Sequence, residues 1–340
     1  MALARGRGQI EDDMSTSLRW GILGTGGIAQ AFVTDLLANG FTVTAVGSRS
    51  QESADAFAAE HGIATAHPSY EALAADPNVD AIYVSTPHPF HAENATLALS
   101  SGKHVLVEKP FTLNAREASE VVDLASESKL VVVEAMWARW LPHMVRLREI
   151  VAAGTIGEVR TVIADHNQSL PTDPNHRLQN PALGGGALLD LGIYPVSFAW
   201  DMLGAPTSVA AISSPTPTGV DRQTAILLGY ANGAQAVLHT ALDTVGPNTA
   251  SVIGTEGWVR IDTVFYNPTS FTVFNTAGEV VETFDEVVSN RGMQYEAWEL
   301  ERRVAEGESA TDVLPASESV GIMGTLDEIR RQIGLRYPGE

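Results

Sequence analysis

Hydrophobic and polar positions divide the chain into two parts with different periodicities. Up to about residue 135, short apolar runs typical of buried strands alternate with segments whose apolar residues recur at helical spacing. We expect strands at 18–23, 41–46, 80–84, 103–107 and 130–134, and helices at 30–37, 51–60, 71–75, 89–100 and 115–127. Strands and helices that alternate in this way form a doubly wound parallel sheet. The first part is therefore predicted to be an α/β domain.

The second part shows the alternation of half-buried strands separated by turn signals. Asn232 with Gly233, and Glu256 with Gly257, are pairs of the kind that join hairpin strands. We expect strands at 159–167, 208–213, 223–230, 234–242, 249–253, 258–262, 270–275 and 279–284. An apolar helix is expected at 188–203, and two amphipathic helices at 293–306 and 316–333. The second part is thus predicted to be a sheet with a few helices.

Length and charge narrow the classes of protein that the chain can represent. Its 340 residues exceed what one core usually supports. We therefore assign a disordered tail to 1–17, a dinucleotide-binding domain to 18–138 and a second domain to 139–340, with the last helix a candidate to pack back on the first domain. The net charge of −20 argues against nucleic acid or an anionic membrane as a partner. With no cysteine, the chain has neither disulfides nor thiolate chemistry.

No targeting signal is visible in the sequence. No uninterrupted apolar run approaches the roughly 18 residues of a membrane span. Residues 1–17 lack the apolar segment of a signal peptide, and Met14 is a possible alternative start. We therefore expect the protein to be cytoplasmic.

A glycine-rich turn follows the first expected strand and opens the first expected helix. In that context the glycines permit a tight turn and the approach of a pyrophosphate, the helix N-terminus supplies N–H donors, and the alanine allows close helix–strand packing. The alternative is a merely structural turn. The predicted cofactor-binding residues are Gly24, Thr25, Gly26, Gly27, Ile28 and Ala29.

The end of the second strand indicates which dinucleotide is bound. NAD sites usually carry an acidic residue here for the ribose 2′-hydroxyl, whereas this chain has Ser48 and Arg49. A guanidinium presents a fork of donors that suits a 2′-phosphate. We therefore predict NADP as the cofactor, with NAD possible; the alternative is a solvated arginine at the start of the next helix.

Two further strand ends carry polar side chains that ligands could contact. Ser85, Thr86, Pro87 and His91 follow the 80–84 strand, and we expect them to line the nicotinamide side of a crevice, although His88 and His91 could equally be surface residues. Glu108 and Lys109, followed by Pro110, end the 103–107 strand abruptly. Ligands bind at the carboxyl ends of strands in open α/β sheets, so Lys109 is the main catalytic candidate. Its alternative is an ordinary surface lysine.

Four motifs in this order resemble the Gfo/Idh/MocA oxidoreductase family. They are G-T-G-G-I-A at 24–29, S-T-P-H-P-F-H at 85–91, V-E-K-P at 107–110 and G-G-G-A-L-L-D-L-G-I-Y-P at 184–195. The resemblance implies a Rossmann domain followed by an α/β domain built on a large open, mostly antiparallel sheet. It also implies that Lys109 is catalytic, and that its bond to Pro110 is cis.

One position departs from the common family pattern. Many members carry histidine where this chain has Tyr194, four residues after Asp190. Tyrosine there, together with the run E-A-M-W-A-R-W at 134–140, resembles the subgroup of dimeric dihydrodiol dehydrogenase, NADP-dependent D-xylose dehydrogenase and glucose–fructose oxidoreductase. In a helix, Asp190 and Tyr194 share one face. Pro195 would cost about 3 kcal/mol inside that helix unless a bend relieved it, and the alternative is a helix that begins near Tyr194.

The expected reaction is reversible hydride transfer between nicotinamide and a hydroxyl-bearing carbon of a sugar, polyol or cyclic diol. Lys109 and Tyr194 are the predicted acid/base pair, assisted by Asp190; a charged lysine would favour tyrosinate. Trp137 and Arg139 are further cofactor candidates, and His166 and Arg177 substrate candidates. Both arginines could instead be structural ion-pair partners.

Other interpretations remain open from the residues alone. Asp165, His166, Asp173 and His176 could suggest a metal, but their spacing does not favour one. A non-catalytic dinucleotide sensor and an NAD-dependent glycoside hydrolase are alternatives on the same fold. Because exposed flat sheets often associate, we expect a homodimer or a dimer of dimers.

Overall fold

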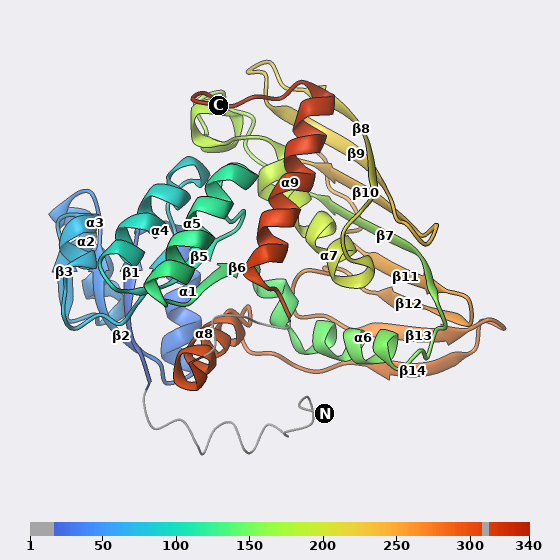
Figure 1. Ribbon diagram of the computed structural model, residues 1–340, viewed down its shortest axis with the longest axis horizontal. Helices are drawn as coiled ribbons and strands as arrows, with labels where there is room; N and C mark the ends of the chain where they lie inside the picture. The colour runs from blue at the N-terminus through green and yellow to red at the C-terminus, as the bar shows by residue number, and fades with distance from the viewer. Residues whose placement is uncertain (1–16, 308–312) are drawn as a thin grey trace.

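The computed structural model describes residues 17–307 and 313–340, and these build two sheets with helices between them (Figure 1). Except for Ser17, the predicted tail and Met14 lie outside the described residues. The predicted fold class is confirmed: a parallel Rossmann sheet comes first and a larger, mostly antiparallel sheet follows.

The first sheet has six strands in the order β3-β2-β1-β4-β5-β6, and all its neighbours are parallel. Its strands are β1 (Arg19–Leu23), β2 (Thr42–Gly47), β3 (Thr65–His67), β4 (Ala81–Val84), β5 (His104–Glu108) and β6 (Val132–Ala135). The five predicted strands are present. The edge strand β3 was not predicted, because three half-buried residues carry no apolar run. The strand order reverses between β1 and β4, so a crevice opens at their carboxyl ends.

Five α-helices accompany this sheet, and the sequence explains where most of them begin. They are α1 (Gly27–Ala38), α2 (Gln51–His61), α3 (Tyr70–Ala74), α4 (His91–Ser100) and α5 (Ala115–Ser128). Ser50, Ser69 and Asn114 cap α2, α3 and α5 through their side chains. Helix α1 has Gly26 at its N-cap and therefore no side-chain cap, and no acidic residue lies in its first turn.

The second sheet has eight strands in the order β14-β13-β12-β11-β7-β10-β9-β8. Its strands are β7 (Val159–Asn167), β8 (Ser208–Pro215), β9 (Asp221–Gly229), β10 (Gln235–Ala241), β11 (Ala250–Gly254), β12 (Gly257–Ile261), β13 (Phe271–Asn275) and β14 (Val280–Phe284). Only β7 and β10 pair in parallel; every other pairing in this sheet is antiparallel.

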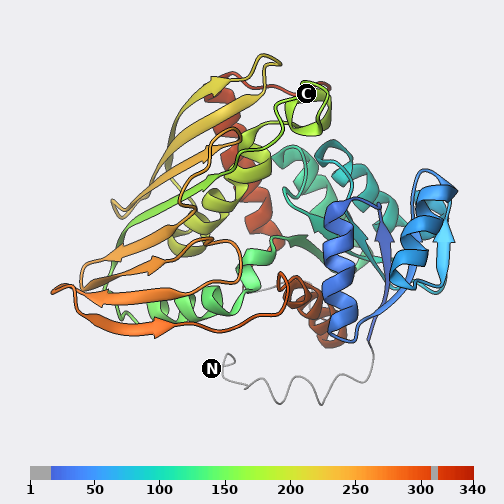
Figure 2. The same ribbon diagram turned by 180° about the vertical axis from the view of Figure 1, so that it is seen from behind.

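Helices cover only the face of the second sheet that looks toward the first, and both views show the other face open (Figures 1 and 2). They include α6 (Pro142–Ala152), which was not predicted, α7 (Ile193–Leu203) and α9 (Ala316–Ile333). Helix α9 also contacts α5, where the Ala115 amide donates to Asp327 Oδ2 over 2.9 Å. Helix α8 (Gln294–Glu306) packs beside β1, where Trp20 Nε1 donates to Glu301 Oε1 over 2.9 Å.

The predicted helix 188–203 is continuous but irregular. A π-helical turn, η6 (Leu188–Gly192), leads directly into α7, so the wider turn accommodates Pro195 within the helix. Among the described residues, the helical segment Pro181–Leu203 is long and apolar enough to cross a membrane, although the sequence shows no uninterrupted run. Because 89% of its most apolar window is buried inside the fold, we interpret it as a core helix.

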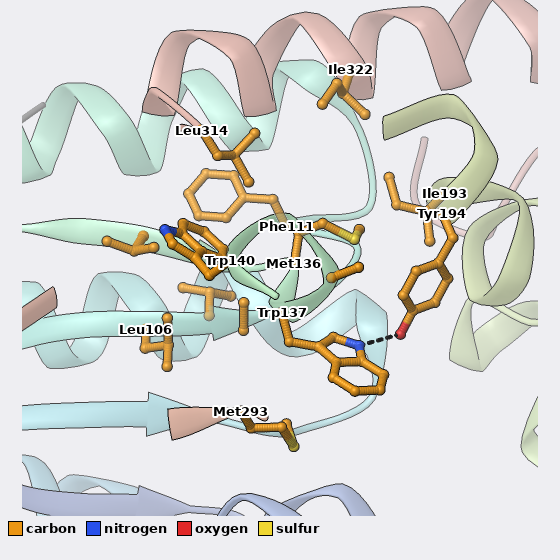
Figure 3. Close-up of a cluster of buried hydrophobic side chains, with 14 of the residues drawn as sticks. Leu106, Phe111, Met136, Trp137, Trp140, Ile193, Tyr194, Met293, Leu314 and Ile322 are labelled. Atoms are coloured by element: carbon orange, nitrogen blue, oxygen red, sulfur yellow. Dashed lines mark hydrogen bonds between the residues drawn. The ribbon is translucent and has the colours of Figure 1, made fainter. Parts of the chain in front are cut away.

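Apolar side chains from both halves of the chain meet beside β5 and β6 (Figure 3). Phe111 and Trp140 of the first half pack in one buried cluster with Leu314 and Ile322 of the second. This shared core continues without a break between the two sheets. The walls of the crevice between them therefore rest on one packed interior.

Candidate active site

A cleft of about 1250 Å³ runs from the glycine turn after β1 to the inner face of the second sheet. Single-ligand pockets usually measure roughly 300–1,000 Å³, so this cleft has room for a large cofactor and a small substrate together. Its lining comes from segments at 24–28, 48–53, 85–91, 108–109, 166–178, 190–194 and 266–267, joined by Tyr70, Trp137 and Arg291.

The glycine turn presents backbone rather than side chains to one end of the cleft. Gly24 has a φ of 109°, which favours glycine, and a Cβ there would lie 2.8 Å from Ser85 Oγ. The uncapped start of α1 leaves its first N–H groups available for an anion. Residues 24–28 line the cleft. Ala29 does not, because its methyl group is buried in the core between helix and sheet.

Ser48 and Arg49 lie at the same end, next to Ser50, Ser53 and Tyr70. Burial raises the pKa of Tyr70, while the hydrogen bond and charge of Arg49 lower it; the net shift is upward. The only carboxylates among the described residues that line the cleft are Glu108 and Asp190, at its other end. The arrangement therefore offers a cation and hydroxyl groups, but no acid, to whatever binds beside Arg49.

The segment after β4 forms one side of the other end of the cleft. Lys109, Asp190 and Tyr194 line this end, and we call it the reacting end. Ser85, Thr86, Pro87 and His91 line the cleft, as does His88. Both histidines are buried, so the alternative of surface histidines is wrong. The ring nitrogens of His91 lie 2.8 Å from Pro110 O and 2.7 Å from Thr86 O. His91 thereby ties this segment to the chain just beyond Lys109, whose bond to Pro110 is cis as the resemblance implied.

Lys109 projects from the carboxyl end of β5 and meets the π turn of the opposite wall. Its Nζ donates to the Asp190 carbonyl oxygen over 2.8 Å and lies 3.8 Å from Asp190 Oδ1. It also sits 5.0 Å from the centre of the Tyr194 ring. Lys109, Asp190 and Tyr194, which are far apart in the sequence, are thus brought together in one cleft.

Three basic groups surround the Asp190 carboxylate. Arg177 Nη1 lies 3.1 Å from Oδ1, and His88 Nε2 lies 3.6 Å from it. Burial alone would raise the pKa of Asp190, but the charges of Lys109 and Arg177 outweigh burial and lower it. Burial lowers the pKa of His88 to about 3, so the imidazole is neutral at physiological pH. Asp190 therefore serves as a fixed negative charge beside Lys109.

The Tyr194 hydroxyl accepts a hydrogen bond from Trp137 Nε1 over 2.7 Å (Figure 3). Burial raises the pKa of Tyr194 well above its usual range, and the nearby carboxylates of Glu108 and Asp190 raise it further. The expectation that Lys109 would favour tyrosinate is therefore wrong, since desolvation dominates. Because the indole occupies a lone pair of the oxygen, the hydroxyl hydrogen of Tyr194 remains available for another acceptor.

Glu108 lines the cleft but is held from within the fold. The Tyr83 hydroxyl donates to Oε1, and the Lys109 amide donates to Oε2 over 3.0 Å. Burial raises the pKa of Glu108 to about 7 even though the Lys109 charge lowers it. Glu108 thus anchors the segment that carries Lys109.

Arg139 does not reach the cleft, so its prediction as a cofactor contact is wrong. Its guanidinium is buried, 3.0 Å from Asp201 and 2.6 Å from Glu318, and it also donates to Ser197. The alternative of a structural ion pair applies. Arg177 combines both roles, because it pairs with Asp190 and also lines the cleft.

The reacting end also contains residues that the sequence did not predict. His166 lines the cleft, and Gln168, Tyr266 and Asn267 line it too. Arg291, from the segment before α8, is exposed and also lines the cleft. No motif marks these positions; the alternation of β7, which turns His166 and Gln168 to the same face, was the one available signal for Gln168. Throughout residues 17–307 and 313–340, no group of three His, Cys, Asp or Glu side chains could hold a metal ion.

Comparison with known proteins agrees with this architecture. The family "Oxidoreductase family, NAD-binding Rossmann fold" (GFO/IDH/MocA) matches residues 18–136, and "GFO/IDH/MocA C-terminal domain" matches residues 144–260. A D-xylose 1-dehydrogenase (NADP(+)) of Hypocrea jecorina is 36% identical, with 95% of this chain and 93% of the relative covered. A trans-1,2-dihydrobenzene-1,2-diol dehydrogenase of Mus musculus is 37% identical over 95% of this chain and 98% of the relative.

Solved structures match over the same extent. A 3-ketoreductase from Actinomadura kijaniata, in complex with NADP and TDP-benzene, is 27% identical with a TM-score of 0.83. The match covers 94% of this chain and 98% of that one. An aldose-aldose oxidoreductase from Caulobacter crescentus has a TM-score of 0.84 at 24% identity, which speaks for the fold alone.

Proposed function

The chain belongs to the GFO/IDH/MocA family of NAD(P)-binding oxidoreductases, and from that premise we propose that it is an NADP-dependent dehydrogenase of a sugar, polyol or cyclic diol. The observation that carries the proposal is the meeting of Lys109, Asp190 and Tyr194 in the same cleft as the glycine turn. Cofactor and substrate could then bind side by side, as hydride transfer requires.

NADP is favoured over NAD by the residues at the Arg49 end. The uncapped start of α1 fits a pyrophosphate, and Arg49 with Ser48 fits a 2′-phosphate. The cleft has no carboxylate at that end among its described lining residues, so the usual partner of an NAD ribose is missing. The name of the Hypocrea relative also specifies NADP.

The residues of the chain hold the substrate oxygen and its proton. When bound, NADP supplies the redox chemistry by exchanging a hydride at its nicotinamide ring. Lys109 uses one of its three N–H donors on Asp190 O and can direct another toward the substrate oxygen. Tyr194, oriented by Trp137, donates a hydrogen bond to that oxygen and keeps its proton, while Lys109 gives the oxygen a proton during reduction and takes one from it during oxidation. Asp190 and His88 orient this pair.

A neutral polyhydroxylated substrate suits the charges of the site. Lys109 and Arg177 already face Asp190, so their charges are largely compensated within the cleft. The chain as a whole carries a net charge of −20, which disfavours polyanionic substrates. The names of the relatives, a xylose dehydrogenase and dihydrodiol dehydrogenases, point the same way.

The open face of the second sheet supports the further proposal of a homodimer. Ile163 of β7, Val237 of β10 and Leu227 of β9 are adjacent in register and each remains about half exposed. Such an apolar row on a flat sheet is typical of an association surface. Light scattering at micromolar concentration should give twice the monomer mass, and a Val237→Asp variant should give the monomer mass.

The function is tested by following NADPH formation with a panel of aldoses and cyclic diols. We expect turnover with NADP and weaker turnover with NAD. Cofactor binding without NADPH formation on any member of the panel would instead indicate a sensor. Release of free sugar from glycosides without net reduction of the cofactor would indicate a hydrolase.

A further inference from the structure

Beside Lys109 and Tyr194, three side chains form a hydrogen-bonded series. We call the direction in which its hydrogens are donated the polarity of the series, and this direction is fixed from one end. His166 lies near the end of β7, Gln168 is the first residue after that strand, and Tyr266 comes from the segment between β12 and β13. All three line the cleft. The His166 ring stacks on the Tyr266 ring at 3.8 Å, and the Tyr194 ring lies 4.9 Å from that of Tyr266. The series therefore borders the place where the substrate reacts.

Pro195 sets the polarity of this series. Proline has no N–H, so the carbonyl of Leu191, four residues earlier, lacks its usual helical donor. His166 Nδ1 supplies a hydrogen to Leu191 O over 3.1 Å. Burial, together with the nearby charge of Lys109, lowers the pKa of His166 to about 3, so the ring is neutral and carries its one hydrogen on Nδ1. His166 Nε2 must then be an acceptor.

Gln168 passes this polarity on to Tyr266. Its amide nitrogen lies 2.8 Å from His166 Nε2 and 3.2 Å from the Tyr266 oxygen, and donates to both. Both hydrogens of the amide are thereby used. The carbonyl oxygen Oε1 has no donor within the described chain, and the hydroxyl hydrogen of Tyr266 has no acceptor there. Burial raises the pKa of Tyr266, which keeps that hydrogen in place.

We propose that Gln168 Oε1 and the Tyr266 hydroxyl form a pair that recognises one substrate hydroxyl, the one next to the reacting carbon. A hydroxyl offers one hydrogen and accepts another, so an acceptor and a donor fixed side by side match it. The inference rests on the proposed function and names its specificity: the preferred substrate is a vicinal diol, whether an aldose or a cyclic diol. A substrate lacking the second hydroxyl leaves both groups without partners in the cleft.

The test compares substrates that differ only in this hydroxyl. We suggest D-xylose with 2-deoxy-D-xylose, and trans-cyclohexane-1,2-diol with cyclohexanol. The wild-type enzyme should prefer the hydroxylated member by about 100-fold in kcat/KM, because two hydrogen bonds in a partly buried site are lost together. In Tyr266→Phe, which keeps the ring stacked on His166, the preference should fall to about 10-fold.

A matched control is Tyr230→Phe. The Tyr230 hydroxyl is buried and has no hydrogen-bond partner among the described residues, but it lies outside the cleft lining. This variant should keep the wild-type preference. Gln168→Leu should lower the preference at least as much as Tyr266→Phe, since the amide holds the acceptor and orients the phenol.

A second measurement tests the polarity itself. Gln168→Glu places an acceptor against His166 Nε2, so the ring must take up a second hydrogen to serve both Leu191 O and the new carboxylate. In protein labelled with ¹⁵N-histidine, His166 should give the spectrum of the neutral Nδ1–H form in the wild type and titrate at a higher pH in the variant. An Nε2–H form in the wild type would overturn the proposal.

The outcomes separate this inference from the proposed function. Turnover of the panel with an equal hydroxyl preference in wild type and Tyr266→Phe would overturn the pair and leave the dehydrogenase intact. Weaker NADP binding in Tyr266→Phe, with an unchanged preference, would assign the pair to the cofactor and overturn its role toward substrate. Cofactor binding with no turnover of any panel member would overturn both.

Discussion

The two ends of the cleft are built in different ways. At the glycine turn, one stretch of five residues, 24–28, presents its backbone to the cleft, and the start of α1 is left uncapped. At the reacting end, Lys109, Asp190 and Tyr194 come from distant segments and are oriented by further side chains such as Trp137. In the proposed function, phosphate binding therefore depends on local backbone geometry, whereas the chemistry depends on tertiary packing. Variants at one end should therefore leave the other end working.

The largest expected effect is at Lys109. Lys109→Met removes the donor nearest the substrate oxygen, and kcat should fall about 100-fold or more, as for loss of a general acid–base group. The affinity for NADPH, measured by fluorescence titration, should change by no more than a few fold. A kcat within about tenfold of wild type would contradict the assigned role.

At the opposite end, Arg49→Ala should act on cofactor choice. Losing a charge-assisted contact to a 2′-phosphate should raise the Kd for NADP by about 10- to 100-fold and leave the Kd for NAD nearly unchanged. Calorimetric titration with both cofactors measures the difference. Equal weakening of the two would mean that Arg49 acts on the fold rather than on the phosphate.

A smaller effect is expected from Trp137→Phe. The indole hydrogen bond to Tyr194 is lost while an aromatic ring is kept, so kcat should fall by about 5- to 10-fold, the usual worth of one hydrogen bond. Trp140→Phe, a neighbouring substitution outside the cleft, serves as the control. A loss in the control as large as that in Trp137→Phe would point to general damage of the core.

The sequence was sufficient where the chemistry is local and insufficient where it is not. The turn at 24–28 and Lys109 follow from contiguous motifs, and the spacing of Asp190 and Tyr194 predicted their common face. Gln168 and Tyr266 could not be paired in advance, because nothing along the chain links β7 to the segment after β12. Arg139 was misassigned because an arginine beside a cleft motif does not reveal that Asp201 and Glu318 enclose it.

Electrostatics at the reacting end also required the structure. The sequence suggested that Lys109 would lower the pKa of Tyr194, but the depth of burial, which no motif encodes, decides the direction. The π turn also required the structure. Pro195 indicated an irregular helix, but the donor that replaces the missing N–H at the Leu191 carbonyl depends on the position of His166.

The smallest expected effect concerns Asp221, which holds the start of the π turn that carries Asp190. Asp221 Oδ2 accepts from the Leu188 amide over 2.8 Å at the start of the π turn, and burial raises the pKa of Asp221 to about 7. Since the unfolded value is about 3.9, the native state binds more protons between these values, so stability falls as pH rises through this window and levels off above it.

Asp221→Asn should therefore reduce the decrease in melting temperature between pH 5 and pH 8 by a few degrees, because asparagine keeps the acceptor without the charge. Thermal melts at the two pH values measure it. Buried Glu108, with its pKa also raised to about 7, should leave part of the decrease in place. A decrease identical to that of wild type would show that Asp221 does not titrate with folding.

Isotope transfer tests the central claim most directly. D-xylose carrying deuterium on its reacting carbon, or the best substrate of the panel labelled in the same way, is incubated with enzyme and NADP, and the NADPH formed is examined by mass spectrometry. The account predicts one deuterium at C4 of the nicotinamide ring, with its formation lost in Lys109→Met although that variant still binds the cofactor. NADPH without deuterium, or sugar consumed without any NADPH, would contradict it.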